Sequence, residues 1–153
     1  MIDGVQIIPL RRFEDERGWF CELARASALP KAIRQTNLVW SSERTIRGLH
    51  YHERGQDDLF VCLQGMVRVV VLHRDSGEVF SQDIGDDNFV GIYIPGHLAH
   101  GYEALSDCLF LYHVTEEYDP ADPDEHGVPW DDPRVAHLWS TREPILSQRD
   151  ALS

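Results

Sequence analysis

Short hydrophobic runs, bounded by polar and turn-forming residues, fill the middle of the chain between Gln35 and Thr115. The clearest runs are Leu59–Leu63, Met66–Leu72, Phe89–Ile94 and Cys108–Tyr112. Turn-forming residues separate them, at Gln64-Gly65, Asp75-Ser76-Gly77 and Pro95-Gly96. Short runs rich in β-branched residues, with Gly and Pro between them, are typical of an all-β sandwich or barrel. We therefore predict a single all-β domain that spans residues 1–153.

The segments on either side of these strands carry weaker patterns. A short helix is expected around Ala24–Ile33, although Pro30 limits its length because proline interrupts a helix interior. The segment Asp119–Pro133 is acidic and rich in proline, which predicts a long loop packed on the barrel. We expect Trp130 and Trp139 to anchor this C-terminal loop region.

The composition is that of a globular protein, with 42% hydrophobic residues. No apolar run is long enough for a secretion signal or a membrane span, so we expect a cytoplasmic protein. The three cysteines, Cys21, Cys62 and Cys108, lie far apart among apolar neighbours, which predicts buried, reduced side chains. Trp19 and Trp40 are also expected to be packing residues.

The charge balance limits the kinds of partner. The formal net charge is -12, with 26 acidic and 14 basic side chains. Such a field repels nucleic acid and anionic membranes, so we expect neither as a partner. An anionic small ligand would need a local positive site, for which Arg17, Arg47 and Arg149 are the candidates.

Three histidines lie at the ends of expected strands. His50 and His52 belong to the run Arg47–His52, and residues two apart in a strand face the same side. His100 follows the turn at Pro95-Gly96. A jelly-roll fold brings these two strand ends together, which makes the histidines candidates for a common site.

The spacing of these groups resembles the pattern of cupins, which implies a jelly-roll β-barrel with short flanking helices. The matching positions are His50, His52, Asp57 or Asp58, Gly65, Pro95-Gly96 and His100. Imidazole nitrogen and carboxylate oxygen are ligands of divalent metals. If a metal is present, its ligands would be His50, His52, Asp58 and His100.

A second resemblance extends over nearly the whole chain. Residues Phe13–Glu22 read Phe-x-Asp-x-Arg-Gly-x-Phe-x-Glu, which resembles the opening motif of dTDP-4-dehydrorhamnose 3,5-epimerases. Further motifs of that family follow in the same order and at nearly the same spacing. They are Gln35-Thr36-Asn37, Arg47–Tyr51, Ile94–Tyr102, Tyr112–Tyr118, and the C-terminal run of Trp130-Asp131-Asp132, Trp139 and Ser147–Asp150.

The resemblance implies an isomerase, and a homodimer with a nucleotide-sugar substrate and no cofactor. Members of this family remove a proton next to the C4 ketone of a dTDP-6-deoxy-4-keto-hexose and return it on the opposite face. By resemblance, His50 is the general base, Asp150 its partner and Tyr112 the acid. The residues implied in substrate binding are Arg17, Glu22, Gln35, Asn37, Arg47 and His100.

Elementary chemistry agrees with these roles. Neutral imidazole titrates near working pH, which suits the removal of a weakly acidic proton beside a ketone. A carboxylate behind the ring sets its tautomer and stabilises the imidazolium. Inversion of the carbon requires an acid on the opposite face, for which a tyrosine hydroxyl is suited, and the planar fork of arginine suits a diphosphate.

The chain departs from the family at one position of the expected site. Family members usually carry a lysine about ten residues after the catalytic histidine, whereas Asp58 aligns there, and His52 stands where a glutamine is common. An enolate-stabilising donor of this kind contributes several kcal/mol. Two alternatives therefore stay open: a 3,4-ketoisomerase of a dTDP-keto sugar, and a metal-binding or non-catalytic cupin. The sequence leaves the choice between C3 and C5 open as well.

Overall fold

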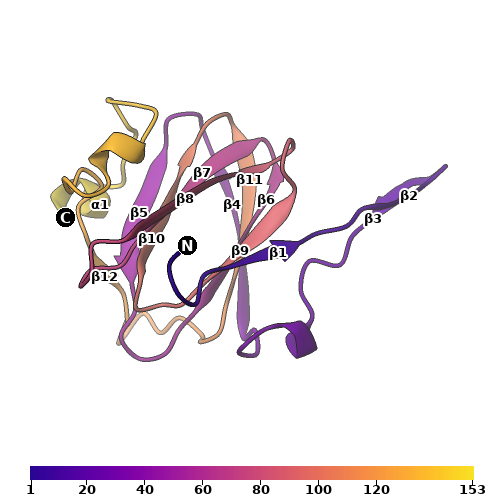
Figure 1. Cartoon of the computed structure of the whole chain (residues 1–153), viewed down its shortest axis with the longest axis horizontal. Helices are drawn as coiled ribbons and strands as arrows, with labels where there is room; N and C mark the ends of the chain where they lie inside the picture. Colours follow the sequence, from indigo (N-terminus) through magenta and orange to yellow (C-terminus); the bar gives the residue numbers. More distant parts are fainter.

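The computed structural model describes all residues from Met1 to Ser153. Two antiparallel five-stranded sheets pack face to face, in the orders β1-β9-β6-β11-β4 and β12-β5-β10-β7-β8 (Figure 1). The first sheet contains β1 (Gln6–Pro9), β9 (Val90–Ile94), β6 (Asp58–Gln64), β11 (Cys108–Val114) and β4 (Gln35–Ser41). The second contains β12 (His126–Gly127), β5 (Ile46–Tyr51), β10 (Ala99–Ala104), β7 (Met66–Leu72) and β8 (Val79–Gly85). The predicted jelly roll is confirmed, although the two sheets do not join into a closed barrel.

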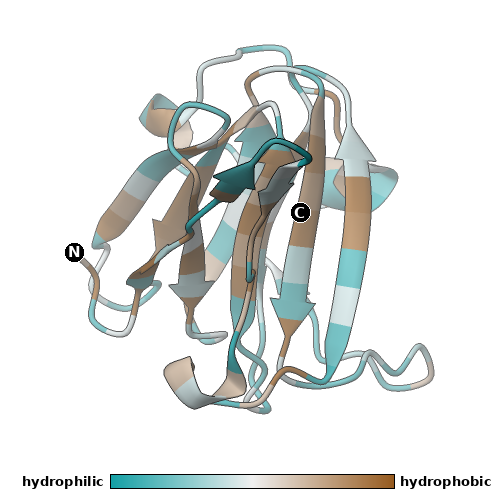
Figure 2. Cartoon of the chain, turned by 90° about the vertical axis from the view of Figure 1, so that its right-hand side faces the viewer, coloured by the Kyte–Doolittle hydropathy of each residue, from teal (hydrophilic) through white to brown (hydrophobic).

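The core lies between the sheets and is built from alternate residues of each strand. In β7, Val67, Val69 and Val71 are fully buried in the larger hydrophobic cluster between the sheets. Val70 and Leu72 point to the other face and are equally buried, because the C-terminal segment covers them. The apolar bands on the strands and the polar loops around them are visible in Figure 2. A strand that is buried on both faces explains why this run is almost continuously apolar.

The strand predictions hold closely, and the helix prediction does not. β7 has the predicted bounds, β6 and β11 extend slightly beyond theirs, and β9 begins one residue later than expected. In place of the helix expected around Ala24–Ile33, only one 3₁₀ turn forms, η1 (Ala26–Ala28). Leu29 is already extended, because the residue before a proline disfavours the helical region.

The C-terminal segment packs on the outer face of the second sheet, as predicted. Within Asp119–Pro133 the only strand is β12. Trp139 is buried and donates its indole N–H to the carbonyl oxygen of Trp130 at 2.6 Å, so the two tryptophans do anchor this segment. The chain then forms the 3₁₀ turn η2 (Ala136–Leu138) and ends in the short helix α1 (Gln148–Leu152). No helix combines the length and the apolar character that crossing a membrane requires.

A two-stranded arm, formed by β2 (Phe13–Asp15) and β3 (Gly18–Phe20), projects away from the sheets (Figure 1). Trp19 on the arm is 54% exposed and Trp40 on the edge strand β4 is 61% exposed, so the prediction that both are packing residues is wrong. Neither position has enough of the same chain around it to cover an indole ring. Cys62 and Cys108 are buried as predicted, whereas Cys21 at the base of the arm is half-buried; all three cysteines are free thiols.

Candidate active site

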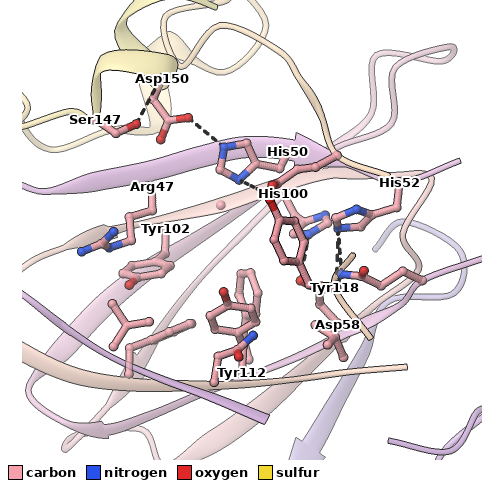
Figure 3. Close-up of a pocket in the computed structure, with 18 of the residues that line it drawn as sticks. Arg47, His50, His52, Asp58, His100, Tyr102, Tyr112, Tyr118, Ser147 and Asp150 are labelled. Atoms are coloured by element: carbon pink, nitrogen blue, oxygen red, sulfur yellow. Dashed lines mark hydrogen bonds and ion pairs between the residues drawn. The ribbon is translucent and has the colours of Figure 1, made fainter. Parts of the chain in front are cut away.

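One large cavity, with a volume of about 1240 Å³, opens between the two sheets. Strands β4, β6 and β11 form one wall, β5 and β10 form the opposite wall, and the C-terminal segment closes one side. Both His50 and His52 line it, which confirms that they face the same side of the chain. Figure 3 shows the side chains that converge on this space.

His50 and Asp150 form a close pair at the edge of this cavity. His50 Nε2 lies 2.7 Å from Asp150 Oδ1 (Figure 3). The Gly48 N–H donates to Asp150 Oδ2 at 3.1 Å. Ser147 caps the helix that carries Asp150, because its Oγ accepts the backbone N–H of Asp150 at 3.1 Å. Burial alone would raise the pKa of Asp150, but the hydrogen bonds from His50 and Gly48 outweigh it and hold that pKa below its usual value. The carboxylate is therefore ionised, and when it accepts the N–H of Nε2, Nδ1 is the ring nitrogen that can take up a proton.

The two histidine motifs each contain a glycine, Gly48 and Gly101, where strands β5 and β10 come close together. Gly48 adopts a φ of +134°, and a Cβ at this position would lie 2.8 Å from Gly101 Cα and 2.9 Å from the His100 carbonyl oxygen. A Cβ at Gly101 would lie even closer to the Arg47 carbonyl oxygen. The β5 and β10 strands approach at this point, and the register shifts between His100 and Tyr102. Glycine is required because any side chain would push apart the strands that carry His50 and His100.

Glu125 is a cavity residue that sequence reasoning missed. Its Oε1 lies 3.5 Å from His50 Nδ1, and its Oε2 accepts a hydrogen bond from Arg149 at 3.0 Å. Arg149 Nη2 is itself 3.4 Å from His50 Nε2. The acidic segment that carries Glu125 gave no signal in the sequence, because its position beside β5 depends on the pairing of β12 with that strand.

Tyr112 lies on β11, in the wall opposite His50 (Figure 3). Burial, and then the negative charge of Asp58, raises the pKa of Tyr112 above its ordinary value, so its hydroxyl keeps its proton at neutral pH. Asn37 on β4 is its partner in the strand register. Gln35 donates to Asn37 Oδ1 at 2.9 Å and accepts the backbone N–H of Tyr118 at 2.9 Å, which places Tyr118 at the cavity rim.

The second group in the cavity is a buried cluster of His52, Asp58 and His100 (Figure 3). His100 Nε2 lies 3.2 Å from Asp58 Oδ2, and His52 Nε2 lies 3.7 Å from Asp58 Oδ1. Asp57, which the sequence offered as an alternative to Asp58, points away and accepts hydrogen bonds from Tyr93 and Gly96. His50, the fourth ligand of the predicted metal set, is not a member of this cluster.

Two of the predicted substrate-binding residues lie outside the cavity of their own chain. Arg17 is on the arm and pairs with Asp15, and Glu22 pairs with Arg25. Arg47 does line the cavity and donates to Ser41 Oγ at 2.9 Å. The projection of the arm separates Arg17 and Glu22 from the other predicted site residues, a separation that the linear order of the motifs does not reveal.

Fold and site together define a cupin-type protein whose cavity carries a histidine–aspartate pair opposite a tyrosine. The profile of the family described as dTDP-4-dehydrorhamnose 3,5-epimerase matches residues 1–153, and the chain belongs to this family of isomerases. The spore coat polysaccharide biosynthesis protein SpsL of Bacillus subtilis is 38% identical over 149 residues, covering 92% of this chain and 98% of SpsL. The dTDP-4-dehydrorhamnose 3,5-epimerase of Escherichia coli is 36% identical, covering 97% of this chain and 88% of that protein.

The similarity extends to solved structures. The crystal structure of the 3,5-epimerase from Legionella pneumophila, in complex with dTDP-4-keto-L-rhamnose, superposes on this chain with a TM-score of 0.88 at 29% sequence identity. The match covers 99% of this chain and 87% of the Legionella protein. The agreement in fold thus extends over nearly the whole chain.

Proposed function

We propose that this protein epimerises C3, C5 or both carbons of a nucleotide-linked 4-keto-6-deoxy sugar. The observation that carries the proposal is the arrangement of one cavity, in which the His50–Asp150 pair stands on one wall and Tyr112 on the other. Inversion of a carbon next to a ketone needs a base on one face of the sugar ring and an acid on the opposite face. Family membership over residues 1–153 favours this reaction over the 3,4-ketoisomerase.

In the proposed mechanism, His50 removes the proton from the carbon beside the C4 ketone, and the electron pair moves into an enolate. Asp150, held ionised by its hydrogen bonds, stabilises the imidazolium that forms. Tyr112 then donates its proton to the same carbon from the opposite face, and the C4 ketone is restored. One proton leaves the sugar and one is added, so the product is an isomer and the two residues exchange protons with water before the next turnover.

The charge of the cavity supports one position for the nucleotide in this proposal. Eight carboxylates and three arginines line the cavity, so most of its surface repels a diphosphate. Arg54 and Arg149 already pair with carboxylates, whereas Arg47 donates to Ser41 Oγ and has no carboxylate partner, so Arg47 is the arginine suited to the diphosphate. Gln35 and Asn37 on β4 would contact the rest of the nucleotide, and His100 would support the sugar end of the site.

The exposed arm supports a homodimer as the active form. The arm and the edge strand β4 expose large apolar side chains, namely Phe13, Trp19, Phe20, Leu38 and Trp40. A second copy that covers them would bring the arm of one subunit to the cavity of the other. Arg17 and Glu22 would then complete the substrate site from the second subunit and add the positive charge that the cavity lacks.

Deuterium incorporation tests the proposed reaction directly. The protein is incubated in D₂O with dTDP-4-keto-6-deoxyglucose, and NMR follows the signals of H3 and H5. We expect loss of one or both signals and the appearance of an inverted sugar, and we expect His50→Asn to abolish both changes. A 3-keto product would instead identify a ketoisomerase, and no exchange at either carbon, with this and related 4-keto sugar nucleotides, would contradict the proposal.

A further inference from the structure

The His52–Asp58–His100 cluster has a geometry that the base and acid roles do not explain. All three side chains are nearly inaccessible, with exposures of 6%, 4% and 3%. One atom from each residue lies within 4.8 Å of the others, and the same three residues line the cavity. Two imidazoles and one carboxylate thus meet at a point that is buried on the protein side and open toward the substrate space.

Hydrogen bonds on the far side of each ring orient the two histidines. His52 Nδ1 lies 2.6 Å from the carbonyl oxygen of Asp124, and His100 Nδ1 lies 2.8 Å from that of Leu98. A carbonyl oxygen only accepts, so each Nδ1 carries a proton, and Nε2 is the ring nitrogen left to bind an ion. The proton that His100 Nε2 shares with Asp58 Oδ2, at 3.2 Å, would be displaced by a bound ion. Both Nε2 atoms point to Asp58. Backbone carbonyls that fix the tautomer from behind are the usual second layer of a histidine metal site.

A fourth polar group borders the same point. The Gln56 side-chain amide lies 3.2 Å from His52 Nε2 and 3.0 Å from Asp58 Oδ1. A half-turn of this amide exchanges its nitrogen for its oxygen, which would then face the cluster as a further neutral ligand. The anionic lining of the cavity adds a general attraction for a cation.

We propose that His52 Nε2, His100 Nε2 and an Asp58 carboxylate oxygen bind a divalent transition-metal ion. Two imidazoles and one carboxylate suit Zn²⁺, Fe²⁺, Co²⁺ or Mn²⁺ rather than Ca²⁺ or Mg²⁺, which prefer oxygen ligands alone. Because the three residues line the cavity, a bound ion would be accessible from the substrate space. The metal-binding site does not depend on the epimerase reaction. One further role does rest on the proposed function: the ion would polarise the ketone oxygen in place of the family's lysine.

Cobalt binding tests the site, because Co²⁺ absorbs visible light according to its coordination. Protein purified without a metal-affinity tag is analysed for bound metal, treated with a chelator, and titrated with CoCl₂. We expect saturation at one Co²⁺ per chain and bands typical of mixed nitrogen and oxygen ligands. His52→Ala and Asp58→Asn should each weaken binding by about 100-fold or more, because loss of a ligand costs at least as much as loss of its supporting groups.

The matched control is His137→Ala, which removes an exposed histidine far from the cluster and should leave the titration unchanged. Far-UV circular dichroism of each variant shows whether the fold is kept. A wild-type chain that gives no cobalt bands, or that binds Co²⁺ as tightly in both ligand variants as in the wild type, would overturn the proposal. Metal binding without deuterium exchange would contradict the epimerase alone, and exchange in a chain that binds no metal would contradict the metal site alone.

Discussion

Asp150, near the C-terminus, lies 2.7 Å from His50 in β5, so the last helix of the chain completes a pair whose other member is 100 residues earlier. The carboxylate is buried, whereas the His50 side chain is 20% exposed toward the cavity. The partly open member of the pair is therefore the one that can meet a substrate, and the buried member sets its tautomer and charge.

The first prediction concerns this pair. Asp150→Asn keeps the size of the side chain but removes the charge that stabilises the imidazolium, so we expect kcat to fall by about 100- to 10,000-fold. Deuterium exchange and product formation, measured under saturating substrate, should fall together. The control is Asp131→Asn, an exposed carboxylate outside the cavity, which should keep full activity. Activity within about twofold of wild type in Asp150→Asn would exclude a catalytic function for the pair.

The second prediction separates the acid from the base. Tyr112→Phe keeps the ring in the wall opposite His50 but removes the hydroxyl that the proposed mechanism uses for inversion. We expect deuterium to enter the substrate with its original configuration retained, while the inverted product falls by about 100-fold or more. NMR distinguishes the two, since exchange and inversion change different signals. Tyr51→Phe, which alters a tyrosine outside the cavity, should behave as wild type, and undiminished inversion in Tyr112→Phe would assign the acid to another group.

The fold and much of the site follow from the sequence, for reasons that particular residues make clear. The run Met66–Leu72 predicts a strand because its β-branched residues favour extended backbone locally, and the Arg47–Tyr51 motif identifies His50 because its residues adjoin one another in β5. The roles of Glu125 and of the arm are not local. Glu125 reaches His50 only through the pairing of β12 with β5, and Arg17 leaves its own chain's cavity because the arm projects outward.

The third prediction uses the contact between β5 and β10. Gly48→Ala introduces a Cβ against Gly101 Cα and the His100 carbonyl oxygen, in addition to the strain of its positive φ. We expect a loss of about 2–5 kcal/mol in the free energy of unfolding, measured by urea denaturation. Gly77→Ala is the matched control, because Gly77 also has a positive φ of +77° but has no atom within 4 Å of its Cβ position. It should cost only about 1–2 kcal/mol, and equal losses in the two variants would contradict the close approach.

The fourth prediction concerns acid sensitivity. Burial lowers the pKa of His113, whose Nδ1 lies 2.8 Å from Thr36 Oγ1 and whose Nε2 has no hydrogen-bond partner. The unfolded chain therefore takes up this proton more readily than the folded chain. This contribution to the free energy of unfolding is fully present above the pKa of the unfolded chain, which is near 6.5. It falls as the pH drops from there toward the lower pKa of the folded chain, by about 1.4 kcal/mol for each pH unit between the two values.

Replacement of His113 by a residue that does not titrate tests this sign. His113→Gln retains a partner for Thr36, and its unfolding free energy should lose less than that of wild type between about pH 7.5 and pH 5. His137→Gln removes an exposed histidine and should follow the wild-type curve. A His113→Gln variant that loses stability on acidification as steeply as wild type would show that other groups govern this range.

The last prediction tests whether two chains share one site. Arg17→Ala lacks the arm residue and His50→Ala lacks the base, so each variant alone should turn over poorly at low substrate concentration. If the arm of one subunit serves the cavity of the other, a mixed dimer contains one intact site, formed by the cavity of the Arg17→Ala chain and the arm of the His50→Ala chain. Equal mixing with subunit exchange should restore about a quarter of the wild-type activity, since about half of the dimers are mixed and each has one working site of two.

Mixing His50→Ala with Arg47→Ala is the control: both residues line the cavity of a single chain, so neither site of that mixed dimer is intact and no activity should return. Recovery in the control, or none in the test pair despite proven exchange, would place Arg17 outside the shared site.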